Sequence, residues 1–187
     1  MHFLESYYIN IIKYDLINRF SYKTIKNIPK LQTIVLSFGC NTVELKKLSI
    51  SLLSLQLITT KRGKLTIATQ PNIILKIKKG NPVGCKVVLK KTVMYQFIYK
   101  LFLEILPGTK NKILLKKTLY PNNISYNLEN IFVFKELEKN YMLFNHLKNL
   151  QITIITNTKT NRELIFLLNS FRFRVNLKKT FANVTQW

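Results

Sequence analysis

A large excess of positive charge constrains what this chain can fold into. The 187 residues include 30 Lys and Arg but only 8 Asp and Glu, so the net charge is +22 at neutral pH. Self-repulsion of this size opposes a compact state, and solubility needs a net charge of only about 2–8 in a small domain. We therefore expect a polyanionic partner, because neutralising phosphates releases counterions whatever the base sequence. An anionic membrane surface is the alternative partner.

The rest of the composition permits a packed core. Hydrophobic residues make up 47% of the chain and aromatic residues 12%, which excludes wholesale disorder. This length is typical of a single domain. We expect one domain, which binds this partner, over residues 1–175, followed by a polar tail over residues 176–187. No apolar run reaches the ~18 residues of a membrane-spanning helix.

Codon bias explains a second feature of the composition. Lys outnumbers Arg by 25 to 5, and Ala occurs only at positions 68 and 182, whereas Ile, Asn, Leu and Lys are abundant. The favoured residues have A/T-rich codons, as in many organelle genes. The N-terminal sequence MHFLESYYIN has neither the basic segment of a signal peptide nor the Arg-rich character of a transit sequence. We therefore expect a protein of the mitochondrial matrix that is made inside the organelle.

The residue types that carry catalysis are scarce. The chain contains no Walker or dinucleotide-binding glycine loop, no nucleophile elbow and no zinc-protease motif. His2 and His146 have no evident partner in the sequence, and Cys40 and Cys85 lack the spacing of a metal site or a disulfide framework. Glu136 lies among lysines and is expected on a solvated face. We therefore expect no enzymatic activity, no cofactor and no metal.

Hydrophobic periodicity predicts the main elements of secondary structure. The expected helices cover residues 3–19, a segment that begins at an Asn41 or Thr42 cap and ends near 57, residues 93–105 behind a Thr92 cap, and residues 161–171. The expected strands cover residues 31–38, 84–90, 124–128, 131–134 and 151–156.

Two segments have more than one interpretation. Residues 58–80 predict a short strand followed by a long exposed loop or hairpin tip, or else a plain β-hairpin with Ile73, Ile74 and Leu75 in the core. Residues 136–149 predict a helix or an irregular excursion. Strands and helices follow one another without βαβ regularity. The sequence therefore predicts an α+β fold, with a mostly antiparallel sheet, helices packed on one face and a long basic loop.

The basic residues form short clusters along the whole chain. Eight such clusters are interleaved with Tyr and Phe and have almost no compensating acid. This pattern is typical of a protein that tracks a folded RNA through its shape and phosphates. An RNA-processing or RNA-modifying enzyme with the same surface is the alternative, although the sequence contains neither a cofactor motif nor clustered acids.

One run of the sequence has a specific resemblance. Residues 76–90, KIKKGNPVGCKVVLK, resemble the bacterial-type family of large-subunit ribosomal protein five, which binds 5S ribosomal RNA (rRNA). The family pattern of Gly, Pro, a branched apolar residue and Gly-Cys-Lys-Val is met by Gly80, Pro82, Val83 and residues 84–87. Further segments are similar to the family in the same order, over 28–39, 94–107, 123–138 and 150–173.

The resemblance implies a structural protein of the large ribosomal subunit. Its expected place is the central protuberance, between 5S rRNA and a hairpin of the large-subunit rRNA, beside other large-subunit proteins. The loop over residues 67–79 would reach the peptidyl-site (P-site) transfer RNA (tRNA) and a small-subunit protein across the intersubunit bridge. The expected RNA contacts are Ser37, Lys61, Arg62, Lys64, Lys86, Lys90 and Lys91. The expected contacts of the loop are Gln70, Lys76, Lys78 and Lys79.

The chain also departs from the family pattern on the face that resembles the 5S-binding one. The family's Asn in the first strand, Gln before the loop and Thr after Gly-Cys-Lys-Val are replaced by Ser37, Lys61 and Val88. Residues 68–71, ATQP, stand where the loop of the family is rich in Lys and Arg. Since Val cannot donate the hydrogen bond that Thr donates, we expect more reliance on phosphate contacts, or a ribosome whose 5S rRNA is altered or lost.

Overall fold

The strands of the described residues form one sheet in which every neighbouring pair is antiparallel. A computed structural model describes residues 2–40, 44–102, 116–117, 122–147 and 149–171. The strand order is β2-β3-β1-β6-β5-β4. The strands are β1 (Leu31–Gly39), β2 (Lys64–Ile67), β3 (Pro82–Lys90), β4 (Lys116–Lys117), β5 (Asn123–Leu128) and β6 (Leu150–Thr156).

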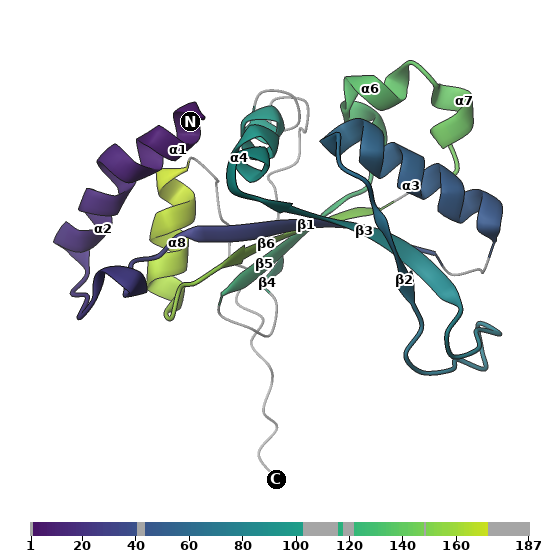
Figure 1. Cartoon of the computed structure of the whole chain (residues 1–187), viewed down its shortest axis with the longest axis horizontal. Coiled ribbons are helices and arrows are strands. Elements are labelled where there is room, and N and C mark those ends of the chain that lie inside the picture. The colour runs from purple at the N-terminus through teal and green to yellow at the C-terminus, as the bar shows by residue number, and fades with distance from the viewer. Residues whose placement is uncertain (1, 41–43, 103–115, 118–121, 148, 172–187) are drawn as a thin grey trace, which may run out of the picture.

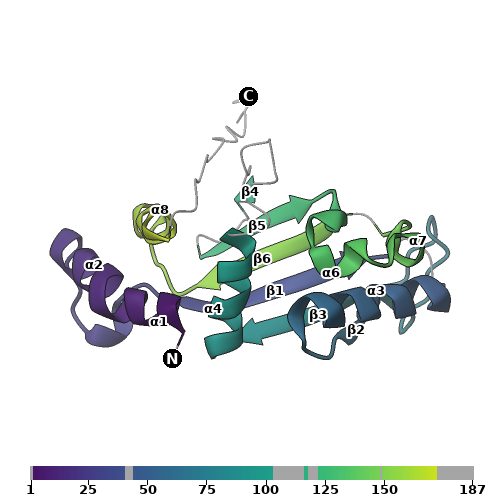
Figure 2. The same cartoon turned by 90° about the horizontal axis from the view of Figure 1, so that it is seen from above.

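Helices cover one face of this sheet and one of its ends. Those over the face are α3 (Leu45–Thr59), α4 (Lys91–Lys100), α6 (Lys135–Glu138) and α7 (Tyr141–Phe144) (Figures 1 and 2). Those at the end are α1 (Phe3–Tyr7), the π-helical turn η1 (Tyr8–Ile12), α2 (Lys13–Arg19) and α8 (Asn161–Ser170). Two 3-10 turns, η2 (Ile25–Asn27) and η4 (Ile131–Val133), complete the described helical segments. The predicted α+β fold, with an antiparallel sheet and helices on one face, is confirmed.

Alternation of apolar side chains explains the central strand. In β1, Ile34, Leu36 and Phe38 are buried, whereas Val35 and Ser37 between them are half-buried. Because successive side chains of a strand point to opposite faces, the first three enter the core under the helices. One hydrophobic cluster joins them to buried residues of the neighbouring strands and of α2, α3, α4 and α8. Each fully buried Leu or Ile contributes roughly 1.5–3 kcal/mol.

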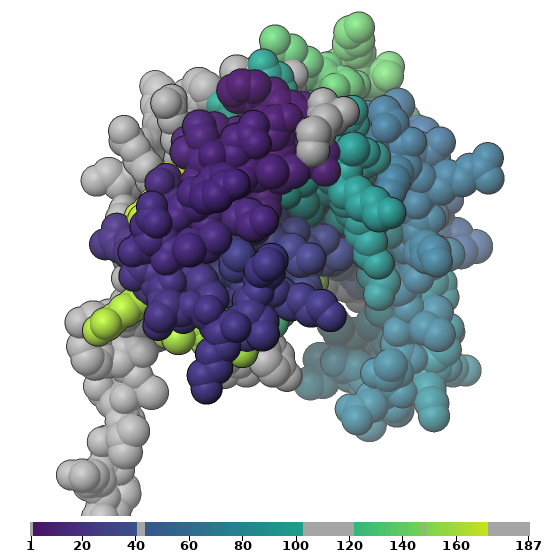
Figure 3. All heavy atoms as spheres, turned by 60° about the vertical axis from the view of Figure 1, so that its left-hand side comes forward, coloured from purple at the N-terminus to yellow at the C-terminus, as the bar shows by residue number. Residues whose placement is uncertain are grey.

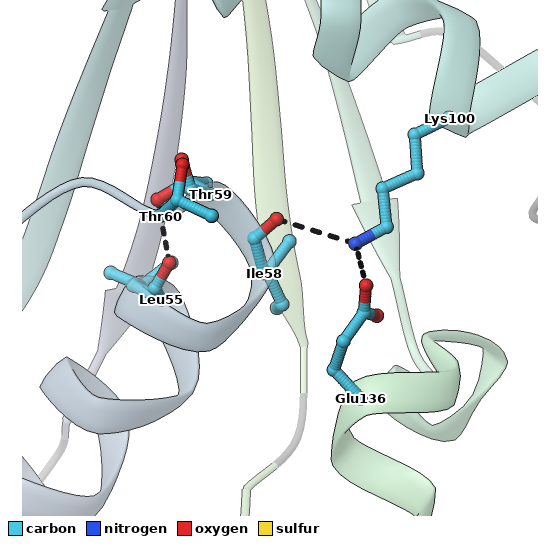
Figure 4. A network of polar contacts seen from close by, with 6 residues as sticks. All are labelled: Leu55, Ile58, Thr59, Thr60, Lys100 and Glu136. Carbon is cyan, nitrogen blue, oxygen red and sulfur yellow. Dashed lines mark hydrogen bonds and ion pairs between the residues drawn. The ribbon is translucent and has the colours of Figure 1, made fainter.

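A polar contact joins three helices above the sheet. The Lys100 ammonium of α4 donates to the Glu136 carboxylate of α6 and to the Ile58 carbonyl of α3, the latter at 3.3 Å (Figure 4). Burial raises the pKa of the Glu136 carboxyl, but the hydrogen bond and charge of Lys100 outweigh burial and hold that pKa below its ordinary 4.5. The prediction that Glu136 lies on a solvated face is therefore wrong, because its carboxylate is paired and half-buried.

One strand prediction and one alternative interpretation are also wrong. Residues 131–134 begin with η4, because the Asn130 side chain accepts a hydrogen bond from the Phe132 amide at 2.9 Å and starts a helical turn. Ile73 and Ile74 are each 92% exposed. The alternative that places them in the core is therefore wrong, and the interpretation as a short strand followed by an exposed loop or hairpin tip is confirmed.

The predicted helix starts are less accurate than the helices themselves. Thr92 is not a cap, because α4 follows β3 directly at Lys91, whose φ of 53° lies in the left-handed region. The predicted caps Asn41 and Thr42 lie outside the described residues, and α3 begins after Glu44.

The remaining helical predictions hold wholly or in part. Residues 3–19 are helical throughout, although the middle turn is η1. Within 136–149, two short helices, α6 and α7, replace one helix or an irregular excursion. The start of α8 has a capping box, in which the Thr160 hydroxyl accepts from the Glu163 amide at 3.3 Å. No helix in the described ranges is both long and apolar enough to cross a lipid bilayer.

Candidate nucleic-acid interface

The strand register aligns polar side chains in a row across the face of the sheet that the described helices leave uncovered, here called the open face. Lys64 pairs with Lys86, Lys86 with Ser37, Ser37 with Gln151, and Gln151 with Asn127. Residues paired directly across neighbouring strands project to the same side of the sheet, so all five share one face, opposite the buried Leu36, Val87 and Ile152. Strands lie about 4.8 Å apart, so this first row extends for about 20 Å.

Two further rows follow along the strands, each about 7 Å beyond the last. The second row contains Val88, Val35, Thr153 and Ser125. The third row contains Lys90, Thr33, Ile155 and Asn123. None of the six strands of the described part contains an Asp or Glu. The open face therefore carries mostly polar side chains, and the described strands add no acidic group to it.

Charge is unevenly distributed over this face. Lys64, Lys86 and Lys90, called the basic half, come from β2 and β3 and are all exposed. The part contributed by β6 and β5, called the neutral half, carries amides and hydroxyls such as Gln151 and Asn127. The ion pairs among the described residues, from Lys47 to Glu44 and from Lys100 to Glu136, do not involve this face. The basic half is therefore free to neutralise an external anion.

The structure brings together only some of the predicted RNA contacts. Ser37, Lys64 and Lys86 share the first row, and Lys90 lies on the same face four residues beyond Lys86. The half-buried Lys61 and the exposed Arg62 lie in the turn that precedes β2.

Lys91 is less closely connected to this group. It is exposed at the junction of β3 and α4, where its positive φ turns the chain away from the strand direction. The predicted contacts of the loop, Gln70, Lys76, Lys78 and Lys79, are all exposed and lie in a separate projecting segment.

That segment is the hairpin end over residues 68–81, which extends beyond the body of the sheet (Figure 1). Its base is closed by the Ala68 amide, which donates to the Asn81 carbonyl at 2.9 Å. Nearer the tip, the amides and carbonyls of Asn72 and Ile77 pair in both directions at 2.9 Å. Backbone hydrogen bonds therefore link the two arms of the hairpin end, which carries lysines and two exposed isoleucines at its tip.

Sequence reasoning missed the neutral half of the open face. Gln151, Thr153 and Asn127 have no charge and match no motif, so no single residue signalled a contact. The available signal was the alternation at the start of residues 151–156, where the polar Gln151 and Thr153 are each followed by an isoleucine. Only the register with β1 shows that these residues continue the row that begins with the lysines.

The remaining reactive groups form no catalytic arrangement within the described ranges. The Cys85 thiol donates to the Ser51 hydroxyl at 3.1 Å. Burial raises the pKa of both Cys40 and Cys85, against the opposing hydrogen bond to Ser51. Both thiols therefore stay protonated and are poor nucleophiles. In that part of the chain no three His, Cys, Asp or Glu side chains gather as metal ligands.

Comparison with known proteins gives consistent matches over most of the chain. A family model that describes the C-terminus of the ribosomal L5 family matches residues 82–175. The large ribosomal subunit protein uL5m of Reclinomonas americana is 30% identical over 183 residues, which cover 94% of this chain and 99% of that protein. The uL5 proteins of Mesoplasma florum and Blochmanniella floridana are 30% and 28% identical, over 90% and 91% of this chain and 94% and 90% of their own length.

Proposed function

Because this chain belongs to the ribosomal L5 family and is therefore a structural component of the large ribosomal subunit rather than an enzyme, we propose that its open face binds rRNA. The partners are 5S rRNA and large-subunit rRNA in the central protuberance. The observation that carries this proposal is the first row, from Lys64 and Lys86 through Ser37 to the neutral half, on a face to which the described strands contribute no acidic side chain.

The two halves of the open face suit two kinds of RNA contact. Lysine ammoniums neutralise phosphates as point charges without reading the bases. Hydroxyl and amide groups, such as those of Ser37 and Gln151, exchange hydrogen bonds with ribose 2′-hydroxyls and exposed base edges. The basic half therefore supplies most of the affinity, and the neutral half fixes the register of the RNA across the sheet.

The hairpin end suits a contact with a more distant partner. We assign it to the P-site tRNA and to a small-subunit protein across the intersubunit bridge, as the family resemblance implies. Support comes from its extension beyond the sheet, from the exposure of Gln70, Lys76, Lys78 and Lys79, and from the hydrogen bonds that hold it together.

The ribosome concerned is that of an organelle. The similarity to a mitochondrial uL5m supports this, and the Lys-rich, Ala-poor composition agrees with an A/T-rich organelle gene. We assign the protein to the mitochondrial matrix, with its gene in the organelle. Residues 1–175 form its single RNA-binding domain, and residues 176–187 form its polar tail.

A salt series tests the role of the open face. The variant Lys64→Ala with Lys86→Ala removes two charges from the first row. In filter binding to large-subunit rRNA, we expect the slope of log affinity against log salt to flatten by about 1 for each lost phosphate contact. Lys135→Ala with Lys139→Ala is the matched control, because both lysines are exposed on the helix-covered side. Equal slopes for the two double variants would contradict the assignment.

A further inference from the structure

A second candidate site lies away from the open face, where α2 meets α8. A concavity of about 400 Å³ opens there, within the range of about 300–1,000 Å³ that is usual for ligand pockets. Its lining consists of two arginines, two phenylalanines, one isoleucine and one amide: Arg19, Arg162, Phe20, Phe166, Ile165 and Asn169. We call it the arginine pocket. Figure 3 turns this end of the molecule toward the reader, with the N-terminal helices in purple and parts of α8 in yellow.

The two arginines have no ion-pair partner among the described residues. Neither Arg19 nor Arg162 lies within ion-pair distance of a carboxylate in that part of the chain. The neighbouring Glu163 carboxylate instead accepts hydrogen bonds from the amides of Lys159 and Thr160, at 3.0 and 3.2 Å. Two guanidinium groups therefore share one concavity, and no carboxylate of the described residues offsets their charge.

The identity of these two residues is informative in this chain. Only 5 of the 30 basic residues are Arg, so two Arg in one pocket depart from the general preference for Lys. A guanidinium differs from an ammonium in its planar fork, which binds two phosphate oxygens at once, and in its ability to stack on rings. A site that needs only positive charge would tolerate Lys, so the pair indicates a need for this geometry.

The floor of the pocket is aromatic. The guanidinium carbon of Arg19 lies 4.8 Å from the centroid of the Phe166 ring. The Phe20 ring meets Phe166 edge-on, with centroids 5.8 Å apart and planes at 75°. Asn169, one turn beyond Phe166 on α8, adds an amide that both donates and accepts hydrogen bonds.

We propose that the arginine pocket binds one unpaired nucleotide of rRNA. The forks of Arg19 and Arg162 hold its phosphate, its base packs against the Arg19–Phe166 pair, and Asn169 bonds to the base edge. Stacking on rings and guanidinium planes is how proteins bind bases that are turned out of RNA helices. An acidic peptide would use the arginines but leave the aromatic floor without a partner, and the net charge of +22 favours RNA.

This inference rests on the proposed function and adds a second RNA contact at another end of the molecule. Its test is a charge-conserving variant of the full chain, Arg19→Lys with Arg162→Lys. Total charge is unchanged, so the salt slope for large-subunit rRNA should stay as in the wild type. Affinity for the rRNA should fall by about tenfold, because a lysine ammonium lacks both the planar fork and the flat stacking surface of a guanidinium. Lys135→Arg with Lys139→Arg, at exposed positions on the helix-covered side, is the charge-conserving control and should change affinity by less than about twofold.

Two further measurements separate the possible outcomes. The thermal unfolding midpoint of the double variant should match that of the wild type. A lower midpoint together with weaker binding would indicate a structural role for Arg19 and would overturn the inference. In ultraviolet-crosslinked large subunits, peptides that contain Phe20 or Phe166 should carry a nucleotide. A crosslink to a neighbouring protein alone would also overturn it.

Failure of this inference is distinguishable from failure of the proposed function. If the wild type binds rRNA and the double variant binds it equally well, the arginine pocket has no role in RNA binding but the open face retains its own. If the wild type does not bind rRNA at all, both proposals are wrong.

Discussion

At the scale of single residues, Gly84 shows how closely the strands approach one another beside the first row. A Cβ atom on this residue would lie 2.4 Å from the Phe38 carbonyl oxygen and 3.0 Å from the Thr66 hydroxyl. Because the first atom belongs to the backbone of β1, the clash cannot be relieved by rotating a side chain. The glycine of the Gly-Cys-Lys-Val run therefore has a packing explanation that does not depend on RNA.

The variant Gly84→Ala should accordingly destabilise the fold. We expect a loss of about 1–3 kcal/mol in the free energy of unfolding, the usual range for overpacking, measured by urea denaturation. Gly39→Ala is the control, since Gly39 pairs with Gly84 across the strands but a Cβ atom there would have nothing within 4 Å. Equal losses for the two variants would show that the close approach to Phe38 does not matter.

Val88 contributes no hydrogen-bonding side-chain group to the open face. Its side chain is 40% exposed in the second row, on the strand that carries Lys86 and Lys90. Val88→Thr keeps the shape and adds a hydroxyl. If the RNA of this ribosome still presents the partner of the family's Thr, affinity for a 5S-type RNA should rise by about 0.5–1.5 kcal/mol with an unchanged salt slope. Val35→Thr, its cross-strand neighbour, is the control, and an equal gain there would rule out a specific contact.

At the scale of elements, the contact between α4 and α6 makes stability depend on pH. The folded-state pKa of Glu136 is lowered, so its contribution is present at pH above the ordinary 4.5 and is lost as pH falls through the lowered value. Glu136→Gln should lower the free energy of unfolding by about 0.5–1 kcal/mol at pH 7. The effect is small because the Glu136 side chain is 40% exposed and solvent weakens its ion pair with Lys100. Urea denaturation should show that the difference in unfolding free energy between the wild type and Glu136→Gln becomes smaller as the pH falls. The exposed Glu138→Gln is the control, and a difference that persists at low pH would contradict the ion-pair explanation.

Local pattern predicted the elements but not how they pair. Alternation in residues 31–38 and 151–156 identified β1 and β6, because burial on one face imposes a period of two. The segment 131–134 failed because a short apolar run is compatible with a strand and with a helical turn, and the Asn130 side chain decides between them. The row that joins Lys86 to Gln151 depends on register between distant segments, which no local window contains.

The candidate site was predictable only where its residues lie close together in the sequence. Lys64 and Lys86 belong to basic runs and a recognisable motif, so the basic half was accessible from sequence. The arginine pocket was not, because Arg19 and Arg162 lie at opposite ends of the chain and meet only when α2 packs against α8.

At the scale of the whole molecule, charge and shape distinguish three surfaces of the protein. The described acids lie outside the strands, the helices close the core on one face, and the open face presents lysines, hydroxyls and amides. The hairpin end projects from one side, and the arginine pocket lies between α2 and α8, the helices at the other end (Figure 1). This arrangement suits a protein that several RNA segments surround.

The most direct test of this account is to purify the tagged full chain from its organelle, sediment the complexes on a sucrose gradient and sequence the RNA that accompanies them. We predict that the wild type sediments with the large subunit together with its rRNA and a 5S-type RNA, and that Lys64→Ala with Lys86→Ala reduces its occupancy there. Sedimentation with the large subunit but without a 5S-type RNA would contradict only the 5S assignment. Absence from the large subunit, or recovery with tRNA alone, would contradict the central claim that the open face binds rRNA.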